Sequence, residues 1–246
     1  MKSKLFSLPF LVLVVVLVLA EVALPRLAEQ TVRHRIENRL GTSDVTVSLA
    51  STPNALLALG QVDHAHVTAH GGRLGDVLTT ELALDGTGIK LDMGELLHGE
   101  SVKVASAENI TLTGVISEDN LKELLARKVN KLQNTEVKMT PDGVTVRANV
   151  KVLGRTADAE MSGTIVDDGG QLLFHMQSLS VTNAAFGKAK LGSLFGDIPL
   201  VKRGKLPFGA RFTDVKMQAG KVVITAAYDA AAAQQNEDVL APYYEN

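Results

Sequence analysis

The stretch LPFGARFTDVKMQAGKVVITAA, residues 206–227, decides the fold class. Apolar and polar residues alternate on both sides of the turn sequence QAG, which predicts two antiparallel strands joined as a β-hairpin. The same alternation recurs through much of the chain, and TPDG at 140–143 and DDGG at 167–170 offer further hairpin turns. We therefore expect long antiparallel strands, each with one apolar face.

Length and composition predict one globular domain. The chain has 246 residues, of which 46% are hydrophobic and 21% charged, enough for one sizeable core. No linker rich in Pro, Ser or Gly divides the middle of the sequence. We expect the domain to cover residues 25–228, followed by a poorly ordered, low-complexity tail at 229–246.

Two segments have helical periodicity. Apolar residues recur at helical spacing in residues 24–40, with Gly41 at the C-cap position. Ser117 can cap a second helix over 117–132. We further expect a strand pair within 77–92 and an apolar, Gly-rich loop over 183–209. This order predicts an α+β fold with an antiparallel sheet.

The N-terminus has the form of an export signal. Lys2 and Lys4 precede an apolar run at Leu8–Ala20, as in a signal peptide that could be cut after Ala20. The alternative is an uncleaved inner-membrane anchor at residues 5–24. In both cases we expect residues after 24 to lie in the periplasm or outside the cytoplasm.

Charge and motifs exclude several classes of function. Without the leader the chain has 23 basic and 27 acidic residues, a net charge of −4, which argues against nucleic-acid binding. There is no Cys for a thiolate site or a nucleophile. On a strand, His64, His66 and His70 would share one face, either as metal ligands or as solvent-facing residues beside an apolar inner face. We expect no metal, no cofactor and no catalytic residues.

Several segments occur in a recognisable order. An apolar leader is followed by LPRLAEQTVRHRIENRLG (24–41), TPNALLALGQV (52–62), GIKLDMGELLHGE (88–100), NITLTGVISEDNLKELL (109–125) and the closing hairpin. This order, over about residues 20–228, resembles the LmeA-like phospholipid-binding family of the bacterial envelope, a relative of the tubular lipid-binding (TULIP) superfamily. The resemblance implies a long, curved antiparallel sheet wrapped around one or two amphipathic helices, with an apolar groove for acyl chains.

The expected function is therefore non-enzymatic binding of phospholipid in the cell envelope, in support of lipid transfer or envelope biogenesis. The expected partners are phospholipid and the membrane surface. The residues expected to line the lipid groove are Leu27, Val32, Ile36, Leu40, Leu121, Leu124, Leu125, Phe195, Ile198 and Phe208. The alternative for each of them is ordinary packing in the protein core. The head-group candidates are Arg33, Arg35, Lys202, Arg203 and Lys205. The alternative hypothesis is a scaffolding envelope protein that packs on a partner without binding lipid. A third hypothesis is a hydrolase.

Overall fold

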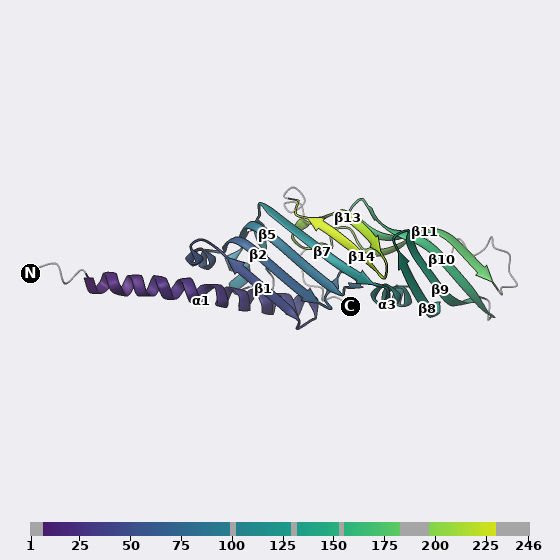
Figure 1. Cartoon of the computed structure of the whole chain (residues 1–246), viewed down its shortest axis with the longest axis horizontal. Helices are drawn as coiled ribbons and strands as arrows, with labels where there is room; N and C mark the ends of the chain where they lie inside the picture. The colour runs from purple at the N-terminus through teal and green to yellow at the C-terminus, as the bar shows by residue number, and fades with distance from the viewer. Residues whose placement is uncertain (1–6, 99–101, 129–131, 153–154, 183–196, 230–246) are drawn as a thin grey trace, which may run out of the picture. The chain divides into compact units, whose positions relative to one another are not determined.

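The computed structural model describes the chain except residues 1–6, 99–101, 129–131, 153–154, 183–196 and 230–246, and it describes no side chains at 7–20, 132, 151–152 and 155. The predicted leader and tail therefore lie largely outside the described residues. The elements, labelled in Figure 1, are α1 (Ser7–Leu40), β1 (Val45–Ala50), η1 (Asn54–Leu59), β2 (Gln61–His70), β3 (Arg73–Leu74), β4 (Val77–Leu78), β5 (Glu81–Leu91), α2 (Met93–His98), β6 (Val104–Ser106), β7 (Asn109–Ser117), α3 (Glu118–Lys128), β8 (Leu132–Thr140), β9 (Gly143–Val152), β10 (Arg155–Asp168), β11 (Gln171–Thr182), β12 (Ile198–Val201), η4 (Pro207–Gly209), β13 (Arg211–Gln218) and β14 (Lys221–Ala227).

The α+β prediction with antiparallel strands is confirmed. One sheet has the strand order β1-β2-β5-β7-β14-β13, with β6 beside β5, and a second has the order β12-β11-β10-β9-β8. Residues group into two compact units: unit 1 is Met1–Ala69 with Ala83–Thr111, and unit 2 is His70–Leu82 with Leu112–Asn246. Because β5 and β7 contribute residues to both units, the units are not successive domains along the chain.

Unit 1 places the helix α1 against β1 and η1 (Figure 1). The inner face of its strands is apolar, because Val45, Val47 and Leu49 of β1 alternate with exposed residues. Gly41 ends α1 as predicted: at φ +68° its N–H donates to the Glu37 carbonyl at 2.9 Å. Glycine enters this left-handed conformation without steric penalty.

The backbone of α1 continues through the boundary that we predicted near residue 24. Pro25 lies inside the helix and has no N–H to donate to the carbonyl of Glu21. That carbonyl instead accepts a hydrogen bond from Asn54 Nδ2 of η1 at 3.1 Å. The helix therefore tolerates Pro25 because η1 satisfies the freed carbonyl. Within the described part of the chain, no helix has the length and hydropathy required to cross a membrane.

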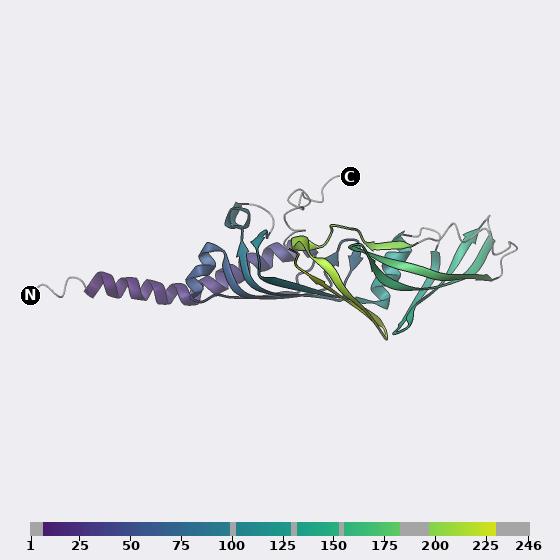
Figure 2. The ribbon, with the colours of Figure 1, turned by 90° about the horizontal axis from the view of Figure 1, so that it is seen from above.

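Unit 2 is built on the five-stranded sheet β12 to β8 and the hairpin β13–β14, with α3 packed on β8 and β4 (Figure 2). The predicted hairpin turns are confirmed: Thr140 pairs with Gly143, Asp168 with Gln171, and Gln218 with Lys221. Ser117 caps α3, since its Oγ accepts the N–H of Asn120 at 3.3 Å. The helix ends at Lys128 rather than near 132, because Leu132 begins β8.

Two local predictions were wrong. The strand pair predicted within 77–92 is not formed, because β4 and β5 of this stretch belong to different sheets. The sequence DGTG at 85–88 lies within β5, where Asp85 Oδ1 lies 2.6 Å from His66 Nδ1 of β2 and the Thr87 carbonyl accepts the N–H of Glu108. Neighbours on both sides therefore hold this segment extended, and Gly88, at φ +58°, provides the local irregularity. The predicted loop over 183–209 contains β12, which pairs with β11 and buries Ile198, Leu200 and Val201.

The bulge in β11 at Gln177, opposite Ser162 and Gly163 of β10, provides a test of how closely this sheet is packed. The register with β11 shifts between Ser162 and Gly163, and a Cβ at Gly163 would lie 2.1 Å from the His175 carbonyl oxygen. We expect Gly163→Ala to lower the free energy of unfolding by about 2–3 kcal/mol, because backbone must move to admit the methyl group.

Chemical denaturation of the variant measures this loss. The control is Ser162→Ala, which removes a 2.7 Å hydrogen bond between the exposed hydroxyls of Ser162 and Ser178 and should change stability by less than about 1 kcal/mol. Equal losses in the two variants would contradict the close approach at Gly163.

Candidate functional site

The strands β9, β10 and β11 present a continuous apolar inner face in unit 2. Their antiparallel register aligns Val146 with Met161 and Met161 with Leu179 in one row. The next row aligns Ala148 with Ala159 and Ala159 with Val181. A third pair, Val150 with Ala157, continues the same face. These side chains are buried or packed against the buried core of the unit.

The opposite face of the same strands is polar. Arg147 Nε contacts Glu160 Oε2 at 2.7 Å, and Asn149 Nδ2 donates to Asp158 Oδ1 at 2.7 Å. Paired polar side chains on one face and aliphatic side chains on the other give the sheet two unlike surfaces. The inner face is therefore the apolar, buried surface of this sheet.

Small alanine side chains form part of this inner face. Ala148, Ala157 and Ala159 occupy positions that in neighbouring rows are filled by Val146 and Met161. We name the set Ala148, Ala157, Ala159, Leu179 and Val181 the alanine row. The alternation in VTVRANVKV, residues 144–152, indicated this strand, but periodicity alone does not say which of its two faces points inward.

The predicted groove leucines of the second helix lie in the core of unit 2. Leu121, Leu124 and Leu125 are fully buried on α3 and belong to one hydrophobic cluster with Ile198 of β12. Phe208 is half-buried in η4, and Phe195 lies outside the described residues. The structure thus brings together four of the predicted groove residues, with α3 as the packing partner of the sheet.

The predicted groove residues of the first helix belong to unit 1. Val32 is buried at 4% exposure, and Ile36 and Leu40 are half-buried. Leu27 is 59% exposed and so contributes little to the interior of this unit.

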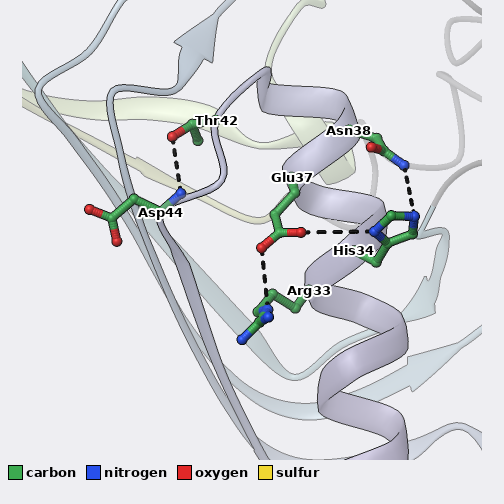
Figure 3. A network of polar contacts seen from close by, with 6 residues as sticks. All are labelled: Arg33, His34, Glu37, Asn38, Thr42 and Asp44. Atoms are coloured by element: carbon green, nitrogen blue, oxygen red, sulfur yellow. Dashed lines mark hydrogen bonds and ion pairs between the residues drawn. The ribbon is translucent and has the colours of Figure 1, made fainter.

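The head-group candidates on α1 have local partners. Arg33 Nε lies 3.2 Å from Glu37 Oε1, within a small network that also includes His34 and Asn38 (Figure 3). The Arg35 guanidinium donates to the Leu96 carbonyl of α2 at 3.1 Å. Arg35 therefore joins α2 to α1.

The candidates after β12 separate from one another. Lys202 lies near enough to Asp76, in the turn between β3 and β4, for its positive charge to lower the pKa of that carboxyl. The preceding residues also approach each other, since a Cβ at Gly75 would be 3.7 Å from Val201 Cγ1. Arg203 instead lies over the β10–β11 turn, where its Nη2 would be 2.8 Å from a Cβ at Gly169. The half-buried Lys205 closes a turn, its N–H donating to the Lys202 carbonyl at 3.2 Å.

Two cations that the sequence did not single out join Lys202. Lys128 Nζ forms an ion pair with Asp76, and Arg127 Nη2 donates to the Asp76 carbonyl at 3.2 Å. The hydrogen bond from Lys128 lowers the pKa of Asp76; partial burial opposes this shift, and the positive charges of Lys128, Lys202 and Arg127 reinforce it. We name Arg127, Lys128 and Lys202 the cationic corner. Lysine and arginine in the last turn of a helix are common, so nothing in the sequence marked them as a site.

The histidines of β2 lie on the exposed face of their strand. Ala65, Val67 and Ala69 are buried. His64, His66 and His70 are exposed, which agrees with the alternative that they face solvent. His66 Nδ1 lies 2.6 Å from Asp85 Oδ1. Among the residues that the structure describes, no three His, Cys, Asp or Glu side chains are arranged to hold a metal ion.

An α+β chain of antiparallel sheets with an apolar inner face has the architecture of the tubular lipid-binding class of proteins. Residues 19–227 match the LmeA-like phospholipid-binding family, and the chain belongs to that family. No curated protein and no solved structure matches the chain. The family resemblance stated from the sequence is thus confirmed.

The ion pair of Asp76 predicts a pH dependence of stability. Because the folded state lowers the pKa of this carboxyl below its ordinary 3.8, the stabilisation is complete above that value and is lost as the pH falls through the folded pKa. We expect Asp76→Asn to lower stability at neutral pH by up to about 1 kcal/mol, as for other partly exposed pairs, and by less at about pH 3.

Denaturant midpoints of both proteins at the two pH values measure this difference. Asp142→Asn, a change on the exposed β8–β9 turn, is the control for loss of a carboxylate alone. A difference between wild type and Asp76→Asn that is as large in acid as at neutral pH would contradict the assignment.

Proposed function

We propose that this protein is a non-enzymatic phospholipid-binding protein of the bacterial cell envelope that holds acyl chains in an apolar groove and supports lipid transfer or envelope biogenesis. The observation that carries the proposal is the alanine row on the apolar inner face of β9–β11, in a chain that belongs to a phospholipid-binding family. In this proposal the acyl chains lie against that row.

The energetics of lipid movement support a binding role without chemistry. Transferring a chain of about 16 carbons into water costs about 0.8 kcal/mol per methylene, or roughly 13 kcal/mol. An apolar surface that replaces water around the chain removes most of that barrier. This role requires aliphatic side chains and no nucleophile, general base or metal.

The cationic corner supports a contact with the phosphate of a head group. Arg127, Lys128 and Lys202 carry three positive charges against two carboxylates, Asp76 and Glu123, the latter 3.6 Å from Arg127, so positive charge exceeds negative charge around Asp76. Lysine and arginine are the side chains that bind phosphate oxygens through charge-assisted hydrogen bonds. Arg203 and Lys205 follow in the same segment but are not counted in this corner, because Arg203 lies over the β10–β11 turn.

The location of the protein is part of the proposal. Residues 1–24 would act as a signal peptide or, through residues 5–24, as an inner-membrane anchor. Residues 25–228 would form the lipid-binding domain in the periplasm, and residues 229–246 a poorly ordered tail. The apolar run after Lys2 and Lys4 supports export, and the family supports a lipid partner.

Photo-crosslinking with a phospholipid tests the proposed site. The full chain is reconstituted with phospholipid that carries a photoactivatable acyl chain, and crosslinked peptides are identified by mass spectrometry. We expect crosslinks within β9, β10 and β11. Ala159→Phe should reduce them several-fold, because the added ring occupies the inner face where acyl carbons would lie.

Ser180→Phe is the matched control, since Ser180 is exposed and pairs with Glu160 on the outer face. It should leave the crosslinks unchanged, and circular dichroism checks that both variants fold. Crosslinks that are absent from these strands in the wild type would contradict the proposal and favour the scaffolding alternative.

A further inference from the structure

Four large apolar side chains of the described residues stand more than half exposed, and all four belong to unit 1. They are Val22 (56%) and Leu27 (59%) on α1, Leu59 (65%) in η1 and Leu97 (62%) on α2. Single exposed apolar residues are ordinary on a protein surface. Here they occur together on three helical segments of one unit, and we name these four residues the helical rim.

Hydrogen bonds hold the three segments together. The Glu21 carboxylate accepts from the N–H of Asn54 at 2.9 Å and of Ala55 at 3.4 Å, so η1 begins beside Val22. The Leu91 N–H donates to the Gly60 carbonyl at 2.8 Å, which brings the end of η1 to the start of α2. Arg35, as described above, joins α2 to α1. The rim residues are therefore carried on segments that fix one another.

The rim residues do not belong to the buried core of unit 1. In each segment a neighbouring side chain fills the interior instead: Val32 in α1, Leu57 in η1 and Leu96 in α2 are all buried. Figure 2 shows α1, η1 and α2 on the same side of the strands of this unit. The rim residues are thus exposed on helical segments whose other side chains already fill the interior of the unit.

The position of the rim along α1 indicates what covers it. The helix backbone runs without a break from residues 7–20, whose sequence LPFLVLVVVLVLA is apolar, into Val22 and Leu27. At 1.5 Å per residue, Leu27 lies only about 5 Å beyond residue 24, where the proposed anchor ends. An anchor in the bilayer would therefore bring Val22 and Leu27 to the membrane–water boundary, together with the start of η1, which is bonded to Glu21.

The charge beside the rim complements an anionic membrane. Arg26 is exposed next to Leu27, and Arg39 is exposed further along the same helix, whereas the exposed Arg33 pairs with Glu37. Exposed leucine with neighbouring arginine is the composition of helices that lie at the lipid head-group boundary.

We propose that the helical rim enters the head-group and acyl boundary of an anionic bilayer and holds unit 1 on the membrane that exchanges phospholipid with the protein. This inference rests on the proposed function, because it takes residues 5–24 to be at the membrane and phospholipid to be the ligand. The rim is a docking surface, distinct from the alanine row of unit 2, which would hold the acyl chains.

Single tryptophans can test the rim because the chain has no Trp. We would introduce Leu59→Trp and Leu97→Trp separately into the full chain, reconstituted in liposomes of phosphatidylcholine and phosphatidylglycerol. The control is Thr46→Trp, an exposed position on the outer face of β1 in the same unit. Each protein is compared in vesicles with and without brominated acyl chains.

We expect the emission of the tryptophans at 59 and 97 to shift to shorter wavelength and to be strongly quenched by brominated lipid. The tryptophan at 46 should keep a water-exposed emission and little quenching. If the tryptophans at 59 and 97 show the same emission and quenching as the tryptophan at 46, the proposed docking surface is rejected. An apolar rim at the membrane boundary would lie within reach of the brominated acyl chains.

The double variant Leu59→Glu with Leu97→Glu separates the possible occupants. We expect it to slow lipid exchange between liposomes and protein while photo-crosslinking to β9–β11 is retained. A change in oligomeric state without any quenching of the rim tryptophans would overturn the proposal in favour of a second copy of the chain. Retained crosslinking with unquenched tryptophans rejects the rim alone, whereas absent crosslinking with quenched tryptophans rejects the proposed groove alone.

Discussion

The register of β10 between β9 and β11 is the constraint on which the candidate site depends. Because side chains alternate between the faces of a strand, a slip of one residue would turn Ala148 and Ala159 outward and bring Arg147 and Glu160 into the interior. Desolvating such charges is costly, so the polar pairs on the outer face oppose the slip. The hairpin turn at 168–171 anchors the register of β10 with β11 from the end of the strands.

Unit 1 shows how one unusual residue is accommodated by a distant one. Pro25 frees the carbonyl of Glu21, and Asn54 satisfies it, while the carboxylate of the same glutamate accepts N–H groups at the start of η1. Glu21 and Asn54 therefore connect a helix to a segment more than thirty residues away through several hydrogen bonds. This connection holds the start of η1 against α1.

We assign acyl-chain binding to unit 2 and membrane docking to unit 1 because apolar side chains and charges are distributed differently in the two units. Unit 2 buries its leucines and presents small aliphatic residues on the inner face of a sheet, with Arg127, Lys128 and Lys202 around Asp76. Unit 1 leaves leucines exposed on helices beside arginines. A small apolar surface suits an acyl chain, and exposed leucine with arginine suits the boundary of a bilayer.

The sequence by itself determined the strands, the turns and the helix caps, because these depend on neighbours a few residues apart. Alternation predicted the hairpin of β13 and β14, Gly41 predicted the end of α1, and Ser117 predicted the start of α3. The order of segments also indicated the family. Tertiary structure alone decided which sheet face is buried, since a period of two is the same for either face. It also decided that DGTG stays within a strand, that the leucines of α3 pack in the core, and that Arg127, Lys128 and Lys202 meet at Asp76, because each outcome depends on contacts between residues far apart in the chain.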